Sequence, residues 1–309
     1  MVVEIRDLVK KYKDLTALDH FDLSINEGDR LALLGPNGCG KTTAINCIMG
    51  LLKFNSGSVK VFGEDMGPDK NDIKARIGLV PQDIVVSDNL NVRENIDYFC
   101  GLYEKNSVKR KEMVDEAIRF TQLKDYQKFF PKKLSGGLKR RLNIACGIAH
   151  NPDFLILDEP TVAVDAQTRS FILNEIKTLC DKGMTILYTT HYLDEVEQVA
   201  GKIVIMEKGK SIASGTADEL KDMISTKELI SIKLNTDQDL SEELKSIVNV
   251  SELTKENGLY KLAFNKGKDN LKHLMDFMEG NDLKYDAIYS ERPSLEHVFL
   301  ELTGRDLRE

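Results

Sequence analysis

The sequence predicts an α/β fold, because segments typical of strands alternate with segments typical of helices along the chain. Three apolar runs carry this prediction, at residues 31–34, 154–157 and 184–189. Such continuous runs are typical of parallel strands that are covered on both faces. The first run leads into a glycine-rich loop and then into a helix pattern at 43–49, which is the order of a strand–loop–helix unit.

The N-terminal stretch has a different pattern. Val3, Ile5 and Leu8 alternate with charged residues, and residues 18–25 repeat this alternation. A period of two predicts half-buried antiparallel strands, so we expect an antiparallel β subdomain beside a mixed main sheet. Residues 56–63 are predicted to form a turn followed by a strand, and residues 77–80 a further short strand.

From about residue 91 to residue 133 the pattern becomes polar and helical. Residues 108–123 place Met113, Ala117 and Ile118 among charged neighbours, which is typical of an amphipathic helix. We therefore expect a helical insertion in the main domain, over about residues 90–150.

A second unit is expected from about Ser225. Its strand and helix patterns follow the order β-α-β-β-α-β, which predicts a small ferredoxin-like module. The elements are predicted at 229–234, 241–247, 250–255, 259–264, 271–278 and 283–289, with a hairpin turn at Asn257-Gly258. Ser294 is placed to cap a last helix and Gly304 to end it. The predicted domains are 1–224 and 225–309.

Composition excludes several classes of protein. The chain is 41% hydrophobic with a net charge of −7, and no apolar run reaches the ~18 residues of a membrane span. The acidic balance predicts no nucleic-acid partner, and the basic run 139–141 is interpreted as a helix face. No signal peptide pattern opens the chain, and five scattered cysteines predict reduced thiols and no zinc site. We expect a cytoplasmic protein with, at most, a peripheral membrane role.

The strongest motif is residues 35–42, which match G-x-x-x-x-G-K-[ST], the pattern of a phosphate-binding loop. Its glycines let the backbone curl so that successive N–H groups face phosphate oxygens. Lys41 adds positive charge for the β- and γ-phosphates, and the Thr42 hydroxyl is a predicted Mg²⁺ ligand. The predicted contact residues are Gly35, Pro36, Asn37, Gly38, Cys39, Gly40, Lys41, Thr42 and Thr43.

Cys39 lies inside this loop, among backbone N–H groups and beside Lys41. These neighbours favour a thiolate, so we expect the pKa of Cys39 to fall below the usual ~8.5 and the thiol to be reactive. The alternative is that Cys39 fills a small position with its sulfur turned to the core.

A pair of carboxylates, Asp158 and Glu159, ends the apolar run at 154–157. At the carboxyl end of a strand, Asp158 suits the coordination shell of Mg²⁺. Glu159 is one residue further on, where it can polarise water as a general base. Together with the phosphate loop, the pair predicts a site that hydrolyses a nucleotide phosphate.

The run Leu134-Ser135-Gly136-Gly137 distinguishes the kind of nucleotide site. Here the chain resembles the ATP-binding cassette (ABC) ATPases, whose signature has this order. Ser135 is placed to cap a helix whose N-terminus, with free N–H groups and a positive dipole, forms a second anion site. The resemblance covers about residues 3–220 and implies the P-loop ABC cassette fold, with ATP and Mg²⁺ as cofactors. It also implies that the signature meets the γ-phosphate held by another copy of the chain.

The resemblance implies roles for further residues. Gln82 resembles the glutamine that reaches Mg²⁺ and the attacking water, and His191 resembles the histidine that contacts the γ-phosphate. Tyr12 stands where the family stacks an aromatic ring on adenine, although a core or loop aromatic is an alternative. Asp165 belongs to a loop that crosses to the other subunit. The implied catalytic residues are Glu159, His191, Gln82 and Lys41; the metal ligands are Thr42, Gln82 and Asp158; the nucleotide contacts include Ser135, Gly136, Gly137, Asp165 and Tyr12.

One stretch departs from the family pattern. The family commonly has Gly-Leu where this chain has Ala163-Val164. Because Asp165 is kept, we expect the loop to function, with a geometry and a coupling between subunits that can differ from those of the family.

The C-terminal run 292–304 is similar to the tail of ATP-binding subunits of bacterial drug, antibiotic and sodium exporters; its alternative is a helix that packs on its own domain. The resemblance implies a subunit that dimerises head to tail around two Mg·ATP and drives export through a separate membrane permease, at the inner face of the cell membrane. Residues 82–99 are expected to touch the permease.

Two other functions remain open. One is a soluble ABC ATPase that acts on ribosomes or DNA, which the single set of motifs and the acidic charge disfavour. The other is an importer ATPase with a regulatory C-terminal module, which the exporter-like tail disfavours.

Overall fold

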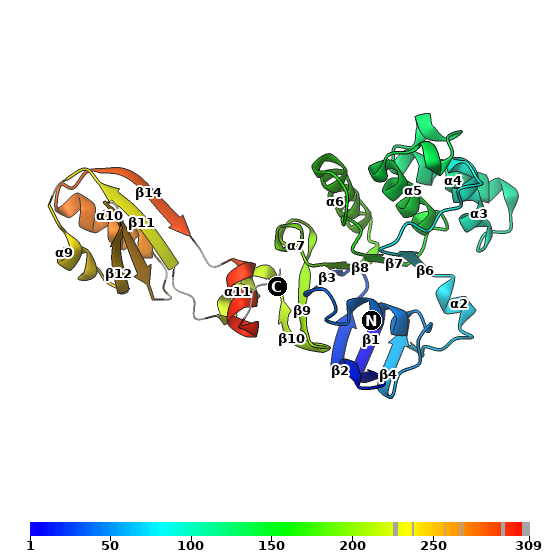
Figure 1. Cartoon of the computed structure of the whole chain (residues 1–309), viewed down its shortest axis with the longest axis horizontal. Coiled ribbons are helices and arrows are strands. Elements are labelled where there is room, and N and C mark those ends of the chain that lie inside the picture. The colour runs from blue at the N-terminus through cyan, green and yellow to red at the C-terminus, as the bar shows by residue number, and fades with distance from the viewer. Residues whose placement is uncertain are drawn as a thin grey trace. The chain divides into compact units, whose positions relative to one another are not determined.

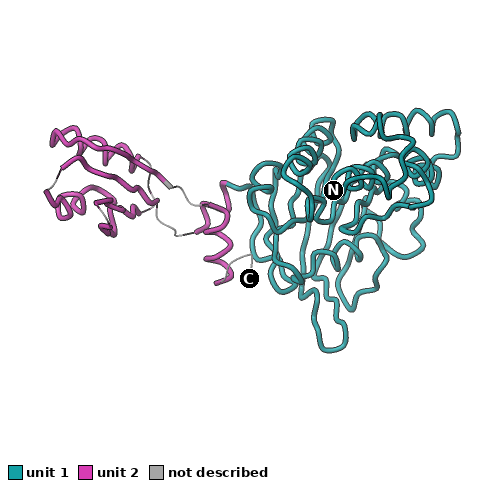
Figure 2. The backbone as a smooth tube through the Cα atoms, turned by 45° about the horizontal axis from the view of Figure 1, so that its top comes forward, with its two compact units in different colours: residues 1–217, 307–309 teal, residues 218–306 magenta. Residues whose placement is uncertain are grey.

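The structure is a computed structural model that describes residues 1–224, 228–236, 238–256, 258–265, 267, 269–291 and 294–304. The chain divides into two compact units between Ala217 and Asp218 (Figure 2). The first unit contains the helices and strands up to β10, and the second contains those that follow.

The first unit is organised around a six-stranded sheet with the order β10-β9-β3-β8-β7-β6 (Figure 1). The pairs β9–β3, β3–β8, β8–β7 and β7–β6 are parallel, and β10 pairs antiparallel with β9. This confirms the mixed sheet and the interpretation of the apolar runs as covered parallel strands. The bounds are β3 (Arg30–Leu34), β6 (Ile77–Val80), β7 (Phe154–Asp158), β8 (Thr185–Thr190), β9 (Lys202–Glu207) and β10 (Lys210–Gly215).

A second sheet of the same unit has the order β2-β1-β4-β5 and is antiparallel throughout, which confirms the predicted N-terminal β subdomain. Its strands are β1 (Val3–Tyr12), β2 (Leu15–Ile25), β4 (Ser56–Val61) and β5 (Glu64–Asp65). Helix α1 (Lys41–Ile48) lies between the strands of the two sheets in the sequence, and Ala44, Ile45 and Ile48 share one buried core with both sheets. This shared core holds the start of α1 in place.

The predicted helical insertion is confirmed. Helices α3 (Val92–Gly101), α4 (Ser107–Phe120) and α5 (Gly136–Ile148) pack on one another, and Figure 1 shows them as one group. Asn91 begins α3 with a capping box that includes Glu94. The other elements of the unit are α2 (Asn71–Lys74), α6 (Ala166–Asp181), α7 (Leu193–Val199) and the 3-10 turns Lys124–Tyr126 and Pro131–Lys133.

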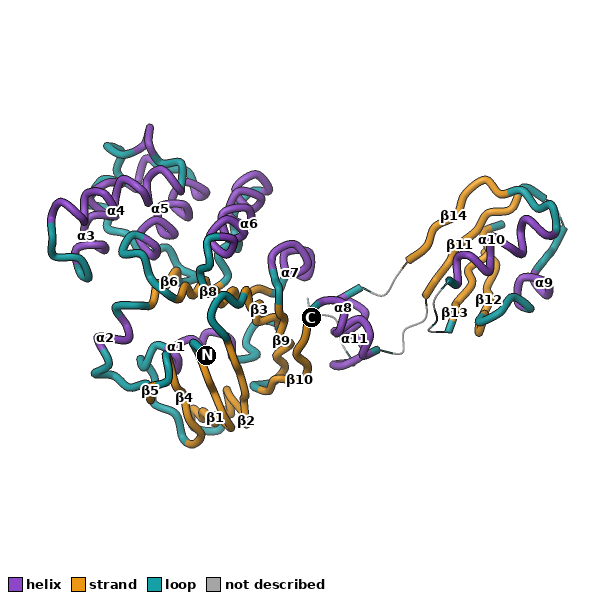
Figure 3. The backbone as a smooth tube through the Cα atoms, turned by 180° about the vertical axis from the view of Figure 1, so that it is seen from behind, coloured by secondary structure: helices purple, strands orange, loops and turns teal. Residues whose placement is uncertain are grey.

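The second unit contains a four-stranded antiparallel sheet with the order β12-β13-β11-β14, which is the arrangement of a ferredoxin-like fold. Alternate residues of its strands are buried, for example Ile230 and Ile232, and α9 and α10 pack on the face that they form (Figure 3). The bounds are α8 (Ala217–Met223), β11 (Glu228–Leu234), α9 (Ser241–Lys245), β12 (Val250–Glu256), β13 (Leu259–Phe264), α10 (Asn270–Gly280), β14 (Tyr285–Glu291) and α11 (Leu295–Thr303).

The ends of α11 agree with the predicted caps. Ser294 forms a capping box with His297, and Gly304 ends the helix with a φ of 71°. The predicted turn residue Asn257 and the tail residues Arg292 and Pro293 lie outside the described residues. The predicted domain boundary after residue 224 remains a prediction; the compact units divide seven residues earlier, at the start of α8.

The described part of the chain contains no helix that combines the length and the apolar character required to cross a membrane.

Candidate functional site

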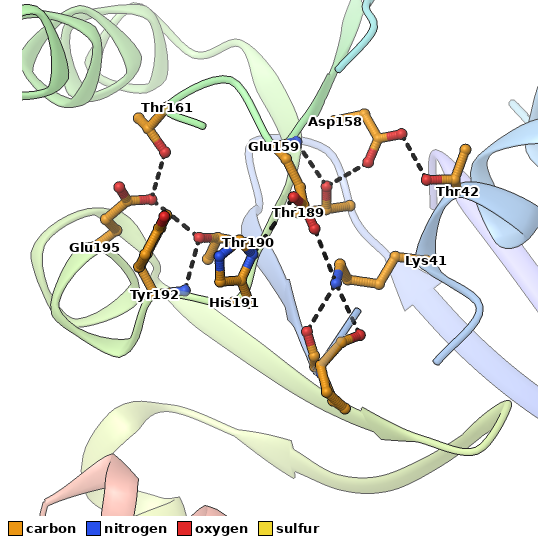
Figure 4. A network of polar contacts seen from close by, with 12 residues as sticks. Lys41, Thr42, Asp158, Glu159, Thr161, Thr189, Thr190, His191, Tyr192 and Glu195 are labelled. Atoms are coloured by element: carbon orange, nitrogen blue, oxygen red, sulfur yellow. Dashed lines mark hydrogen bonds and ion pairs between the residues drawn. The ribbon is translucent and has the colours of Figure 1, made fainter. Parts of the chain in front are cut away.

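The predicted phosphate and hydrolysis residues gather at one edge of the central sheet. Because β3, β7 and β8 are parallel, their carboxyl ends reach the same edge, where Asp158 pairs in register with Thr189. The phosphate loop follows β3, Glu159 follows β7 and His191 follows β8. Figure 4 shows how their side chains converge.

The phosphate loop enters α1 through a backbone that requires glycine. Gly40 is the N-cap of α1 and has a φ of 115°. A Cβ atom at this position would lie 2.5 Å from the carbonyl oxygen of Ala17. No side chain caps α1, so the N–H groups of its first turn remain for a ligand. The loop therefore has the backbone of an anion site, and Asn37, Gly38 and Thr42 are its exposed residues.

Lys41 is buried under this loop. Its Nζ donates hydrogen bonds to the carbonyl oxygens of Gly35 at 2.7 Å and Pro36 at 3.1 Å. The same Nζ lies 3.0 Å from Oε1 of Glu159. The ammonium group thus has three oxygen partners within the chain, and one of them is the predicted general base.

Asp158 and Thr42, two of the predicted metal ligands, lie in direct contact. The Thr42 hydroxyl donates to Oδ2 of Asp158 at 2.9 Å, and the Thr189 hydroxyl donates to Oδ1 at 2.6 Å. Hydroxyl and carboxylate oxygens are ligands that suit Mg²⁺, which usually completes its shell with water and substrate phosphates. The described residues form no group of three or more His, Cys, Asp or Glu side chains suited to a metal. A Mg²⁺ ion at Thr42 and Asp158 would therefore depend on nucleotide phosphates for further ligands.

Glu159 is held between a cation and an imidazole. Its Oε1 faces Lys41, and its Oε2 lies 3.4 Å from Nδ1 of His191. Its backbone N–H donates to the Thr189 hydroxyl at 2.9 Å, and its φ is 46°. A left-handed conformation costs roughly 1–2 kcal/mol for a residue with a Cβ atom, so the surrounding contacts must hold it. The His191 ring rests against Tyr192, with centroids 4.1 Å apart.

Gln82 follows β6, the strand next to β7, and its side chain is exposed. Its backbone, however, is held by helix α5. Arg140 donates to the carbonyl oxygens of Gln82 at 2.7 Å and Pro81 at 3.1 Å, and Asn143 donates to Pro81 at 3.2 Å. Arg140 is 4% exposed. The basic run is therefore not simply a solvated helix face, because its central arginine links α5 to the Gln82 loop.

The signature residues begin α5, as predicted. The Ser135 hydroxyl accepts a hydrogen bond from the N–H of Leu138 at 3.3 Å, and both Ser135 and Gly136 are exposed. A Cβ atom on Gly137 would lie 2.3 Å from the Thr168 hydroxyl, so the start of α5 packs closely on α6. Among the described residues, no hydrogen bond or ion pair joins Ser135, Gly136 or Gly137 to the phosphate loop.

Asp165 caps α6 in its own chain. Its carboxylate accepts hydrogen bonds from the N–H of Thr168 at 2.8 Å and from the Thr168 hydroxyl at 3.0 Å. These hydrogen bonds, the backbone one first, lower the pKa of the Asp165 carboxyl group. In the same loop Ala163 has a φ of 59°, so the position where the family has glycine does adopt a left-handed conformation.

The expected reactive thiolate at Cys39 is wrong. The side chain is 5% exposed, and burial raises the pKa of its thiol; the nearby Lys41 charge and backbone N–H groups oppose this only in part. The sulfur points into the turn, where a Cβ atom on Gly35 would lie 2.7 Å from it.

Tyr12, at the end of β1, is 44% exposed, and Lys10 Nζ lies 4.7 Å from its ring centroid.

Several polar residues that support this site were not predicted from sequence patterns. Thr189 contacts both Asp158 and Glu159, and Thr161 and Thr190 donate to the buried carboxylate of Glu195. The only available signal was that the apolar strand β8 ends in two threonines. Glu195 gave none, because a glutamate in the first turn of a helix is usually solvated.

The chain is similar to known ATP-binding proteins in both of its units. Residues 18–162 match the family model described as ABC transporter, and residues 215–303 match the one described as ATP-binding protein DrrA1-3-like, C-terminal domain. The linearmycin resistance ATP-binding protein LnrL of Bacillus subtilis is 31% identical over 311 residues, covering 100% of both chains. The chain belongs to the family of ABC transporter ATP-binding proteins. It is an ATPase subunit.

Other relatives are similar in sequence to this ABC subunit over nearly all of its length. The daunorubicin resistance ATP-binding protein DrrA3 of Streptomyces coeruleorubidus is 31% identical and covers 97% of this chain and 95% of its own. A Nod factor export ATP-binding protein of Cupriavidus metallidurans is also 31% identical, with 100% and 99% covered.

Solved structures extend the likeness to the fold. An ATP-binding subunit of an ABC transporter has a TM-score of 0.66 at 25% identity, covering 72% of this chain and 93% of its own. A cassette dimer in a post-hydrolysis state, bound to ADP and Pi, has a TM-score of 0.64 at 26% identity, covering 69% and 98%. The ABC cassette fold predicted from the sequence is thereby confirmed.

Proposed function

We propose that two copies of this ATPase subunit close head to tail around two ATP molecules and so drive export through a separate membrane permease. The observation that carries the proposal is the incomplete site in one chain, where the phosphate loop and Glu159 are brought together. The signature begins a different helix and, in the part of the chain that the structure describes, has no polar contact with them. A second copy related by a twofold axis would supply the missing half.

Within one copy, the phosphate loop and Lys41 would bind the β- and γ-phosphates, and Glu159 would orient the attacking water and accept its proton. His191, which contacts Glu159, would contact the γ-phosphate. From the other copy, the N-terminus of α5 at Ser135 would stabilise the charge on the transferred phosphoryl group. ATP would thus bridge two copies, and hydrolysis would remove the bridge.

Mg²⁺ is the metal that this site fits, with Thr42 and Asp158 as its protein ligands and Gln82 as the proposed third. It would neutralise charge on the phosphates when bound. The chain's own contribution is to hold Asp158 ready, through the two hydroxyl groups that donate to its carboxylate.

The permease contact is proposed at residues 82–99, and the protein would lie at the inner face of the cell membrane. Support comes from full-length relatives that are named for drug resistance and Nod factor export. It also comes from the exposed apolar side chains of this segment, which include Ile84, Val85 and Tyr98.

Light scattering on the Glu159→Gln variant with Mg·ATP tests the dimer, because closure should survive while hydrolysis does not. We expect a dimer with ATP and a monomer without it; a monomer in both conditions would contradict the proposal. For the partner, the same ATP-locked variant would be purified from native membranes. An integral-membrane protein is expected to accompany it, and ribosomal proteins would support the alternative function.

A further inference from the structure

Glu195 is a buried carboxylate outside the set of residues that bind nucleotide. It lies in the first turn of α7 and is 1% exposed. Removing a carboxylate from water costs several kcal/mol unless hydrogen bonds and a positive charge compensate. The partners that compensate for this cost therefore indicate what the buried carboxylate does.

Three hydroxyl groups donate to a single oxygen of Glu195. Oε2 accepts from Thr161 at 2.9 Å and from Thr190 at 3.0 Å, as Figure 4 shows. The same oxygen also accepts from the hydroxyl of Tyr188. Burial first, and then the nearby Glu195 charge, raise the pKa of Tyr188, so that its hydroxyl keeps the proton it donates. The second oxygen, Oε1, lies 3.4 Å from Nε of Arg169.

These partners come from the segments that carry the proposed hydrolysis residues. Thr161 lies two residues after Glu159, in the loop that leads to Asp165. Thr190 immediately precedes His191, and its hydroxyl also accepts the N–H of Tyr192 at 3.0 Å. Arg169 lies near the start of α6, four residues after the Asp165 cap. One carboxylate thus joins the loop after β7, the end of β8 and the start of α6.

Thr189 and Thr190, which are neighbours in β8, hydrogen-bond to different parts of the site. Thr189 contacts Asp158 and the backbone of Glu159, whereas Thr190 contacts Glu195 and the backbone after His191. Adjacent residues of a strand point to opposite faces, so the two networks lie on opposite faces of β8. Among the described residues, the Glu195 carboxylate has no hydrogen bond or ion pair with the predicted phosphate ligands, so its effect must pass through Thr161 and Thr190 to the two loops.

We propose that Glu195 is a positioning residue for ATP hydrolysis, which holds the Glu159–Asp165 loop and the His191 loop in register through Thr161 and Thr190. The proposal rests on the proposed function, since it requires Glu159 and His191 to act in hydrolysis. A carboxylate is needed because one oxygen must accept three hydrogen bonds while the other faces a guanidinium. An amide would keep the shape but would present its NH₂ group either to the hydroxyls or to Arg169.

The test compares Glu195→Gln with Glu197→Gln, a matched change at an exposed residue of the same helix. Turnover at saturating ATP, the Kd of a fluorescent ATP analogue and the melting temperature would be measured on the full chain. Errors in positioning cost up to about 100-fold, so we expect Glu195→Gln to lower kcat about tenfold and to change Kd less than about twofold. Glu197→Gln should leave all three values unchanged.

Thr161→Val keeps the test valid if Glu195→Gln does not fold, because it removes a single hydroxyl. It should lower kcat about threefold, and the two losses should not multiply in the double variant, because both changes act on the same hydrogen-bond network. Wild-type kcat in Glu195→Gln or in Thr161→Val, or losses that multiply in the double variant, would overturn the proposal.

Failure of the proposed function has a different result. Wild-type protein and Glu159→Gln belong in the same series. If Glu159→Gln hydrolysed ATP as fast as wild type, the assignment of the site would be wrong whatever Glu195 does. If Glu159→Gln is inactive and Glu195→Gln is normal, only the role of Glu195 fails.

Discussion

In the part of the chain that the structure describes, the N-termini of α1 and α5 are both suited to anions, and they differ in the groups that surround them. The start of α1 is surrounded by groups of the same site: Lys41 contacts Glu159, and Thr42 contacts Asp158. The start of α5 is exposed, and its close packing at Gly137 is against α6. The first is a nearly complete site within one chain, whereas the second is presented outward. This difference fits the proposed head-to-tail dimer, in which one chain would supply half of each of two sites.

The largest expected effect is on turnover, and it tests the site at the start of α1. Glu159→Gln should reduce turnover by about 10²–10⁴-fold, the usual contribution of a general base. It also removes a charge that competes with phosphate for Lys41, so ATP should bind more tightly than to wild type. Steady-state kinetics and equilibrium binding of a fluorescent ATP analogue measure both effects. Lys41→Ala is the control that should lose ATP affinity; unchanged turnover in Glu159→Gln would remove Glu159 from the mechanism.

The next largest effect, also on ATPase activity, tests whether the start of α5 acts on the nucleotide bound by another copy. Ser135→Arg places a bulky side chain at the start of α5 and should lower ATPase activity by about 10²-fold, since donors to the transition-state charge are lost. ATP binding to the monomer should not change. Mixing with Lys41→Ala protein should restore at most one composite site. Weaker ATP binding by the Ser135→Arg monomer would show that the signature acts within its own chain.

A smaller effect concerns the packing of the phosphate loop. Because burial raises the pKa of Cys39, a maleimide should label it at least about tenfold more slowly in native than in unfolded protein. Partial burial also raises the pKa of the Cys180 thiol, to about 12, but Cys180 is the least buried of the five cysteines, so access to the reagent should make it label first. Peptide mass mapping of timed samples measures the order. Rapid labelling of Cys39 with protection by Mg·ATP would show that the loop opens to solvent.

The smallest expected effect is on the melting temperature, and it concerns Ala163 in the loop between Glu159 and Asp165. Ala163→Gly relieves a left-handed residue but adds freedom to the unfolded chain, so we expect a net gain of about 0.5 kcal/mol. For a unit of this size the melting temperature should rise by about 1–2 °C. Ala166→Gly, the same change in the first turn of α6, should lower it. A fall in both variants would mean that Ala163 does not sit in the strained conformation.

The predictions that depended on local pattern were confirmed. The order of strands and helices, the helical insertion and the caps at Ser135, Ser294 and Gly304 follow from short-range spacing. The ferredoxin-like order of the second unit follows from its alternation of elements and its hairpin. The prediction for Cys39 failed, because a list of neighbours in sequence does not show which way a side chain turns or how much water it keeps.

By itself, the sequence determined the family, the fold and the identity of the motif residues, since these depend on residue types at fixed spacing. Tertiary structure decided which of them meet. It brought Glu159 between Lys41 and His191, buried Arg140 against the Gln82 loop, and placed Glu195 among three hydroxyls. The physical reason is that burial and hydrogen bonding depend on segments far apart in the chain. The same glutamate or arginine is solvated on one helix face and holds two loops together on another.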